Sequence, residues 1–300
     1  METLSYNEGI IYEFNKDNPF IKKVASGTTL RIETYDCFQN QIQSEETEVA
    51  NIDWDKINPA TGPIYVENAQ LGDVLKVKIE KIEIGDQGVM VIGPDLGIMG
   101  DRFEKMESKI LSIQDDHVIF NDLELPLHKM IGVIGVAPKG DGINCGTPGA
   151  HGGNMDNKMV TEGATLYFPV FTEGALFSLG DFHAAMGDGE VSVSGVEVPG
   201  AATVTLEVIK GETIRQPLLE NDEVFSQIYS AETLDEAAKE ATREMIDRIV
   251  AKSNLPISDV TMLMSAVGQA EICQIVDPLM TARFVVPKWL LEKLDVTLIG

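Results

Sequence analysis

The sequence predicts a mainly β protein in which a β-sandwich or barrel body precedes a smaller helix-containing domain. Three stretches of alternating apolar residues each follow a glycine, over residues 72–79, 163–170 and 200–208, and a period of two is typical of half-buried strands. After about residue 210 the apolar residues recur at helical spacing instead. We therefore expect a β-rich body over residues 1–210 and an α+β region over residues 211–300 packed on it.

The body is expected to contain further short strands. Residues 28–35 alternate in polarity and end at Asp36, whose carboxylate is a candidate metal ligand or base, or else a turn-capping group. A cluster of Asn, Pro and Gly over residues 58–63 predicts a turn. Short apolar runs predict strands at residues 110–113, 118–120 and 130–135.

Helices and one strand are expected near the C-terminus. A helix is predicted over residues 230–252, because Thr233 and the glutamate three residues later form a capping box before an apolar face. A second helix is expected to begin at Ser258, capped by its hydroxyl group. Residues 272–276 then predict a strand, and Pro287 opens a last helix.

The chain is strongly acidic, and this charge limits its partners. It has 48 Asp and Glu against 23 Lys and Arg, a net charge of −25. We expect no nucleic acid or membrane partner, because both bind proteins through basic patches. The charge suits divalent cations and small neutral or cationic ligands. No apolar run approaches the roughly 18 residues of a membrane helix, and the N-terminal residues show no signal-peptide pattern.

The cysteines indicate a reducing compartment. Cys37, Cys145 and Cys273 are far apart and form no Cys-x-x-Cys pair, and their odd number argues against a disulfide framework. We therefore expect reduced cysteines in a cytoplasmic protein, each acting as a small core residue.

The stretch from Gly180 to Glu190 carries most of the candidate chemistry. Asp181 and His183 are two residues apart, so an extended segment points both to one face, and Asp188 and Glu190 repeat that spacing after a glycine turn. Three carboxylates this close repel one another unless a cation or a proton lies among them. Carboxylate and imidazole ligands suit zinc or a similar divalent ion. A polar surface turn between two strands is the alternative.

A second unusual stretch runs over residues 140–156. It is too rich in glycine for a helix and too polar for a core strand, and long loops in compact domains are usually functional or disordered. His151 is followed by Gly152 and Gly153, which leave room around its ring. We therefore expect His151 and Asp156 to join the carboxylates of the first stretch.

Several separated motifs resemble the acetamidase/formamidase family, in the same order along nearly the whole chain. They are Asn58–Pro63, Gly149–Asp156, Gly174–His183, Gly187–Glu190 and the tail around Gln274–Pro278. The resemblance implies hydrolysis of short aliphatic amides to a carboxylate and ammonia. It also implies a β-sandwich body with an α+β C-terminal part, and a homodimer or higher homo-oligomer. The family's site maps onto Asp36, His151, Asp181, His183 and Glu190.

The resemblance and the chemistry of amide hydrolysis together lead us to expect a metal-dependent amidase. The expected cofactor is a divalent metal, with zinc first and calcium or manganese as alternatives. Asp36, Asp181 and His183 are the expected metal ligands. Glu190 is the expected general base, which later hands its proton to ammonia, and His151 is a ligand or an oxyanion donor.

Further residues are expected to support this site. Asp188 and Asp156 are expected to orient ligands or substrate, and the backbone N–H groups near Gly152 and Gly153 to hold the oxyanion. The expected substrate is a small neutral amide. Family members often carry a polar residue where this chain has Met186, which makes the polarity of one pocket wall differ.

Two alternatives to the metalloamidase are open. Cys145 lies six residues before His151 and would be the nucleophile of a thiol mechanism, although its pKa would have to be lowered by a neighbouring base. A non-catalytic β-sandwich that binds a divalent cation or a carbohydrate is the alternative of a different class. Its acid-rich turns would hold calcium for stability.

Overall fold

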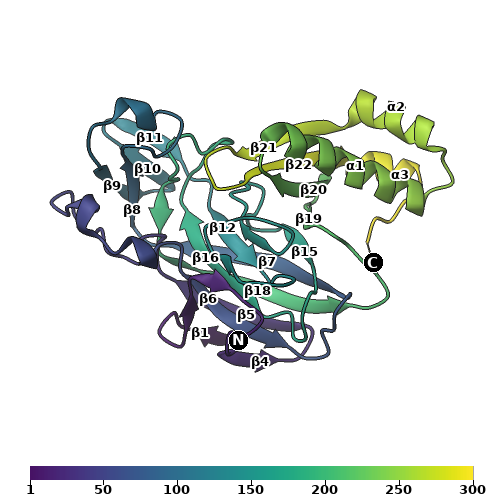
Figure 1. Cartoon of the computed structure of the whole chain (residues 1–300), viewed down its shortest axis with the longest axis horizontal. Helices are drawn as coiled ribbons and strands as arrows, with labels where there is room; N and C mark the ends of the chain where they lie inside the picture. Colours follow the sequence, from purple (N-terminus) through teal and green to yellow (C-terminus); the bar gives the residue numbers. More distant parts are fainter. Residues whose placement is uncertain (300) are drawn as a thin grey trace.

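Two β-sheets packed face to face form the body of the protein. The structure, a computed structural model, describes residues 1–299 and is mostly strands, with its α-helices near the C-terminus (Figure 1). The predicted mainly β fold with a helix-containing C-terminal part is thus confirmed. Among the described residues, no helix is both long and apolar enough to cross a membrane.

The first sheet has nine strands and runs through both parts of the chain. Its order is β1 (Glu2–Leu4), β5 (Thr28–Thr34), β18 (Gly200–Ile209), β7 (Val74–Ile84), β15 (Thr165–Pro169), β19 (Leu218–Glu220), β20 (Val224–Ala231), β22 (Met280–Pro287) and β21 (Gln269–Gln274). The three glycine-led strands of the sequence, β7, β15 and β18, are neighbours here. Because β15 pairs with β19, the sheet continues past the boundary expected near residue 210, and the division into two domains stays a prediction.

The second sheet has eleven strands and carries most of the candidate site. Its main path is β11 (Leu123–Pro126), β10 (His117–Phe120), β9 (Glu107–Gln114), β8 (Gln87–Ile92), β17 (Glu197–Val198), β16 (Phe177–His183), β12 (Met130–Gly135) and β14 (Gly152–Asn154). Strand β6 (Ala60–Val66) pairs with β16 and also with β2 (Ile10–Ile11) and β4 (Lys22–Val24).

Short elements complete the body. Strand β3 (Glu13–Phe14) pairs with β13 (Ile143–Asn144) in a two-stranded sheet. Single-turn 3₁₀ helices are η1 (Val49–Asn51), η2 (Trp54–Lys56) and η3 (Gly100–Arg102).

The main core lies between the two large sheets. Buried side chains of the first sheet, such as Ile32 and Ile79, belong to one apolar cluster with Ile131, Leu179 and Phe182 of the second sheet. Alternate residues of a strand point to opposite faces, so the period-two pattern of the sequence places one face of each sheet in this core. Burial of apolar surface on both sheets holds them together.

The helices α1 (Leu234–Lys252), α2 (Ile257–Val267) and α3 (Lys288–Lys293) gather with β20, β21 and β22 at one end of the molecule (Figure 1). Two expected helix starts differ from the structure. Ser230 belongs to β20, where it pairs with Thr281 of β22, so α1 begins only after its cap at Thr233. The second helix begins after Pro256, and no side chain caps it, so the expected Ser258 cap is wrong.

The Thr233 cap gives a stability prediction. Its hydroxyl oxygen accepts a hydrogen bond from the Glu236 N–H at 3.2 Å, which pairs one of the free donors at the helix start. Thr233→Ala is expected to lower the free energy of unfolding by about 1 kcal/mol, measured by urea denaturation. Thr242→Ala, in the interior of the same helix, is the control and should cost less. Equal effects of the two changes would contradict a capping role.

Candidate active site

Pairing of β16 with β17 builds the centre of the candidate site. His183 ends β16, and its cross-strand partner on β17 is Glu197. The Nε2 atom of His183 lies 3.1 Å from Glu197 Oε2, 3.6 Å from Asp181 Oδ1 and 3.8 Å from Asp156 Oδ1. One buried imidazole therefore lies among three carboxylates from three segments of the chain.

Two groups of potential metal ligands meet around this imidazole. The first group is Cys37, Asp181 and Glu197, and the second is Asp156, His183 and Glu190, with the ligand atoms of each group within 4.8 Å of one another. Asp277 adds a further buried carboxylate, which accepts a hydrogen bond from Asn154 Nδ2 at 3.1 Å. Burial, followed by the negative charge of Asp156, raises the pKa of Asp277. We call the following residues the acidic cluster: Asp156, Asp181, His183, Glu190, Glu197 and Asp277.

The backbone of the acidic cluster is unusual. Asp156, Asp181 and Glu190 have φ values of 39°, 57° and 46°, in the left-handed region that residues other than glycine rarely adopt. The expected convergence of Asp181 and His183 is therefore not that of a simple extended strand. Such conformations cost free energy and concentrate at functional sites.

Two glycines give the cluster its room. A Cβ atom on Gly132 would lie 2.4 Å from Asp181 Oδ2 and 2.5 Å from Asp156 Oδ1. A Cβ atom on Gly195 would lie 2.6 Å from Nδ1 of His183. Glycine is therefore required at both positions for the carboxylates and the imidazole to pack as they do.

Burial and mutual repulsion raise the pKa values of three acids of the cluster, Asp156, Glu190 and Glu197. Burial, followed by the charge of Asp181, raises the pKa of Asp156 to about 7. Burial likewise raises the pKa of Glu197 to about 8, although the positive charge of His183 opposes it. Burial and the charge of Asp156 raise the pKa of Glu190 well above its usual range. This many buried acids can be ionised together only beside a cation.

The imidazole responds in the opposite sense. Burial disfavours the charged form of His183, but the negative charges of Glu197 and Asp181 outweigh it and raise its pKa well above the ordinary value. The surroundings of His183 thus favour a positive charge at the centre of the cluster.

The polar atoms of the cluster fit a bound cation. Within residues 1–299, both nitrogens of His183, both carboxylate oxygens of Asp156 and one oxygen each of Asp181, Glu190 and Glu197 are buried without a hydrogen-bond partner. An unpaired buried polar group costs about 1–3 kcal/mol, so native proteins rarely leave several together. Carboxylate oxygens, an imidazole and the Cys37 thiol are ligands that a divalent transition metal accepts.

A small cavity of about 230 Å³ opens beside the cluster. Asp181, Glu190, Glu197 and Asp277 line it on one side. Its other walls combine apolar side chains with amides, namely Phe38, Trp54, Ile57, Val91, Leu96, Asn58, Asn144 and Asn154. An apolar cavity with a few convergent polar groups is the usual form of a small-molecule site.

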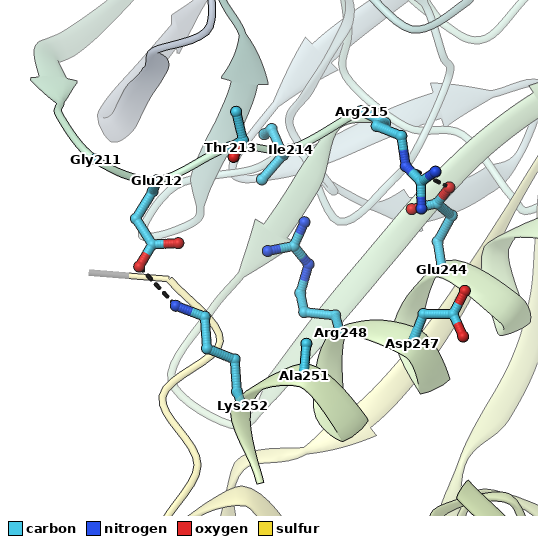
Figure 2. A pocket seen from close by; sticks show the side chains of 10 residues that line it. All are labelled: Gly211, Glu212, Thr213, Ile214, Arg215, Glu244, Asp247, Arg248, Ala251 and Lys252. Carbon is cyan, nitrogen blue, oxygen red and sulfur yellow. Dashed lines mark hydrogen bonds and ion pairs between the residues drawn. The ribbon is translucent and has the colours of Figure 1, made fainter.

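A larger groove lies elsewhere and holds none of the cluster. It has a volume of about 560 Å³ and lies between α1 and the segment 211–215 (Figure 2). Ion pairs flank it, between Arg215 and Glu244 at 3.2 Å and between Lys252 and Glu212 at 2.6 Å. Arg248 projects into it and donates to the carbonyl oxygen of Leu298 at 3.3 Å.

The structure places Asp36 beside the cluster rather than in either ligand group. Its Oδ1 accepts hydrogen bonds from the N–H groups of Phe38 and Asn40, at 2.9 and 2.7 Å. This is the turn-capping arrangement that the sequence left open as an alternative. Burial raises the pKa of Asp36 to about 6. Its neighbour Cys37 belongs to the first ligand group instead.

His151 is buried but lies outside both ligand groups. Its ring packs edge-on against Phe14, with 5.2 Å between the ring centroids, and neither ring nitrogen has a hydrogen-bond partner within residues 1–299. Burial alone lowers its pKa to about 4, so the ring is neutral. The N–H of Gly152 donates to Gly149 O at 3.0 Å and is not free for an oxyanion, and Gly153 pairs with Ile134 of β12.

Asp188 lies near the cluster but faces another way. It forms ion pairs with Arg283 and with Lys158, both at 2.8 Å. It therefore contacts no acid of the cluster directly, although it lies on the loop that also carries Glu190.

The thiols are poor candidates for a nucleophile. Cys145 is fully buried, packs with Phe14, Ala60 and Val133, and donates weakly to Ile11 O at 3.6 Å. Burial raises the pKa of its thiol well above the ordinary value, whereas a reactive thiol needs a lowered one. The burial of Cys145 and its raised pKa therefore do not support a thiol mechanism.

Sequence reasoning missed Glu197 and Asp277 and gave Cys37 only a packing role. Glu197 stands between Val196 and Val198, and a lone acid in an apolar run is a signal for a buried functional charge. Asp277 precedes Pro278 in the tail motif, which gave a second signal.

In this two-sheet body, a buried cluster of carboxylates and an imidazole lies beside a small cavity. Such an arrangement is typical of the active site of a hydrolase. The sequence profile described as the Acetamidase/Formamidase family matches residues 5–145 and 141–277. The chain belongs to this family, which confirms the resemblance carried by its motifs and the expectation of an amidase-type hydrolase.

Relatives and solved structures agree with this assignment. The crystal structure of a predicted acetamidase/formamidase from Thermoanaerobacter tengcongensis is 51% identical, with a TM-score of 0.97, and the match covers 99% of this chain and 98% of that one. A formamidase of Methylophilus methylotrophus is 24% identical over 298 residues, with 76% of this chain and 73% of that protein covered. A relative from Schizosaccharomyces pombe is 23% identical over 263 residues, which are 66% of this chain but only 63% of that protein.

Proposed function

We propose that this protein hydrolyses short aliphatic amides to a carboxylate and ammonia at the acidic cluster, with the help of a divalent metal ion. The observation that carries the proposal is the set of buried, unpaired carboxylate and imidazole atoms beside the cavity. Membership of the acetamidase/formamidase family supports the choice of an amide as substrate.

The cavity supports a small neutral substrate. Its volume of about 230 Å³ is below the roughly 300–1,000 Å³ of pockets for drug-sized ligands. The side chains of Phe38, Trp54 and Val91 can receive a short alkyl group and exclude water from it. The amides of Asn144 and Asn154 can hydrogen-bond a carboxamide. Because acids line the cavity, a negatively charged substrate would be repelled.

The acidic cluster supports zinc as the first choice of metal. We propose Asp181 and His183 as ligands, in keeping with the sequence, and add Asp156 and Glu197, whose oxygens lie within 3.8 Å of the same imidazole nitrogen. An imidazole and a nearby thiol favour a transition metal over calcium, which takes oxygen ligands. The chemistry that a bound ion would supply is a lowered pKa of its water and a polarised amide carbonyl.

We assign the proton transfer to Glu190. Its carboxylate belongs to the same group as His183 and Asp156 and lines the cavity. It would accept a proton from the attacking water and pass it to the nitrogen of the departing ammonia. Amine is a poor leaving group until it is protonated, so the second transfer is as necessary as the first.

The assay of choice is ammonia release from formamide, acetamide and propionamide. It is run on metal-depleted protein and again after zinc, manganese or calcium is added. We expect activity to vanish on depletion and to return with zinc. Activity indifferent to metal would keep the amidase but refute the ligand assignments. Metal binding without ammonia release would favour the non-catalytic cation-binding protein. The expected homo-oligomer and cytoplasmic location stay predictions from the sequence.

A further inference from the structure

Arg283 is a buried charge that the proposed chemistry does not use. It lies on β22, is 2% exposed, and is the first by volume among the fully buried side chains. Burying a guanidinium without partners is costly, so its ion pairs must compensate for lost hydration. A buried group of this kind calls for a role that an apolar side chain could not fill.

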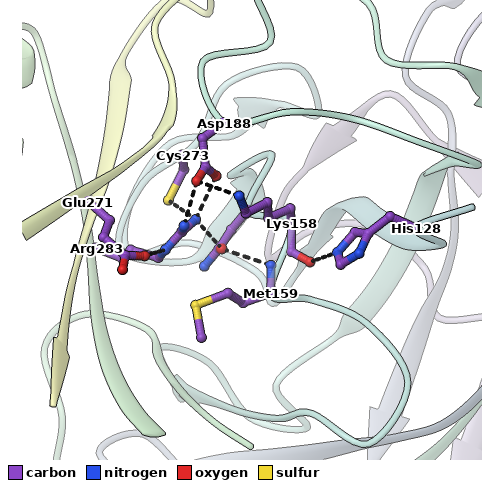
Figure 3. Close-up of polar contacts among 8 residues, drawn as sticks. His128, Lys158, Met159, Asp188, Glu271, Cys273 and Arg283 are labelled. Atoms are coloured by element: carbon purple, nitrogen blue, oxygen red, sulfur yellow. Dashed lines mark hydrogen bonds and ion pairs between the residues drawn. The ribbon is translucent and has the colours of Figure 1, made fainter. Parts of the chain in front are cut away.

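The partners of Arg283 come from three separate segments (Figure 3). It donates from two nitrogens to the two oxygens of Asp188, at 3.0 and 2.8 Å. Its Nε donates to Glu271 of β21 at 2.7 Å, and Nη1 also donates to Asn157 Oδ1 at 3.0 Å. The planar guanidinium can make all these bonds together because its donors form a fixed fork.

Each of two bonded segments carries an acid of the cluster. Asn157 directly follows Asp156, and Asp188 is two residues before Glu190. Lys158 Nζ also reaches Asp188, at 2.8 Å, so the two segments are joined to each other as well as to β22. The positive charges of Arg283 and Lys158 neutralise the negative charges of Asp188 and Glu271.

The backbone continues the same connection. The N–H of Gly189 donates to Cys273 O at 2.7 Å, and the N–H of Ile275 donates to Gly189 O at 3.3 Å. Beyond this bridge, Gln274 Oε1 accepts from the N–H of Asp277 at 3.0 Å. Hydrogen bonds thus connect the loop of Glu190 to the segment of Asp277, next to the ion pair between Arg283 and Asp188.

These hydrogen bonds oppose the electrostatic repulsion between the carboxylates of the acidic cluster. Asp156, Glu190 and Asp277 are buried within reach of one another's charge, and like charges in such surroundings repel strongly. Without a link outside the cluster, the loop of Glu190 would relax away from Asp156. Catalysis is sensitive to displacements of about 1 Å in such groups.

We propose that Arg283 is a positioning residue that fixes Glu190 and Asp156 in the acidic cluster by joining both of their segments to β22. This inference rests on the proposed amide hydrolysis. It adds a residue that touches neither substrate nor metal, and it predicts a change in kcat rather than in KM, because the geometry of proton transfer is altered while the cavity walls stay in place.

The test compares Arg283→Met and Asp188→Asn, assayed for kcat and KM with acetamide in the holoenzyme. We expect kcat to fall about 10–100-fold for either variant, with KM little changed. Asp188 is exposed, so Asp188→Asn keeps the test informative even where Arg283→Met folds poorly. Arg248→Met is the matched control, because it removes a half-buried guanidinium from the separate groove of Figure 2, and it should keep the wild-type kcat.

A double variant separates positioning from general stability. In a Glu190→Gln background, Arg283→Met should cause a smaller further fall in kcat than it causes in the wild type, because only the displacement of Asp156 can still act. A full additional fall, or a wild-type kcat in folded Arg283→Met and Asp188→Asn, would overturn the proposal.

Amide hydrogen exchange gives a readout that does not depend on activity. The N–H groups of Gly189 and Ile275 should exchange faster in Arg283→Met, while those of α1 keep their protection. Unchanged exchange at both amides would contradict the inference. If the wild-type protein releases no ammonia, the proposed function fails, and the exchange experiment still decides whether Arg283 holds this loop.

Discussion

Replacing Glu190 by Gln is expected to lower kcat for acetamide by about 10²–10⁴-fold, the usual contribution of a general base. The amide keeps the shape of the side chain but cannot take a proton from water. Glu190 lies in one group with Asp156 and His183, so the position of the base relative to its neighbours is set. Steady-state ammonia release measures the effect.

The metal content of Glu190→Gln distinguishes a general base from a metal ligand. If Glu190 is the base, Glu190→Gln should bind as much metal as the wild type, measured by mass spectrometry of the eluted ion. Loss of metal together with loss of turnover would make Glu190 a ligand and refute its assignment as base. Glu292→Gln, on the exposed surface of α3, is the control for the change of one Glu to Gln.

Adding a single methyl group at Gly132 is expected to be almost as damaging. The new Cβ would lie 2.4 Å from Asp181 Oδ2 and 2.5 Å from Asp156 Oδ1, far inside van der Waals contact, so both carboxylates must move. A displacement of about 1 Å can cost 10²-fold in rate, and we expect Gly132→Ala to lose about that much in kcat. Weaker retention of metal should accompany the loss, measured by competition with a chelator.

The backbone at Gly132 makes this a test of the site rather than of the fold. Gly132 is not among the residues with positive φ, so alanine causes no backbone strain, and overpacking should cost about 1–3 kcal/mol of stability. Gly163→Ala is the control: its φ of +85° is strained for alanine, but no atom lies within 4 Å of the new Cβ. It should lose stability and keep its kcat. A fully active Gly132→Ala would show that the packing of the two carboxylates does not matter for turnover.

Local patterns in the sequence predicted the main strands and part of the site. The period-two strands became β5, β7, β15 and β18, because alternation directly reports which face of a strand is buried. Asp181, His183 and Glu190 lie in one cluster because a single short segment carries them all. The Thr233 cap was readable for the same reason, since its hydrogen bond spans three residues.

Groups that meet only through the sheet were harder to predict. Glu197 reaches His183 because β17 pairs with β16 in one register, and a strand of two residues has too short an apolar pattern to predict that register. Asp277 follows α1 and α2 in the sequence and is therefore far along the chain from the other acids of the cluster. Asp36 showed the converse problem, because its spacing to Phe38 and Asn40 allowed a turn cap as readily as a ligand.

The continuous nine-stranded sheet has a consequence for the order of events during synthesis. Strand β15 has its outer edge unpaired until β19 has been made, and such an edge is a template for association with other chains. Contacts this distant in sequence form slowly. The loop of Glu190 obtains its partners only when Cys273 and Arg283 have left the ribosome. Most of the chain must therefore persist as an incomplete sheet, which makes chaperone protection most valuable before its last segments emerge.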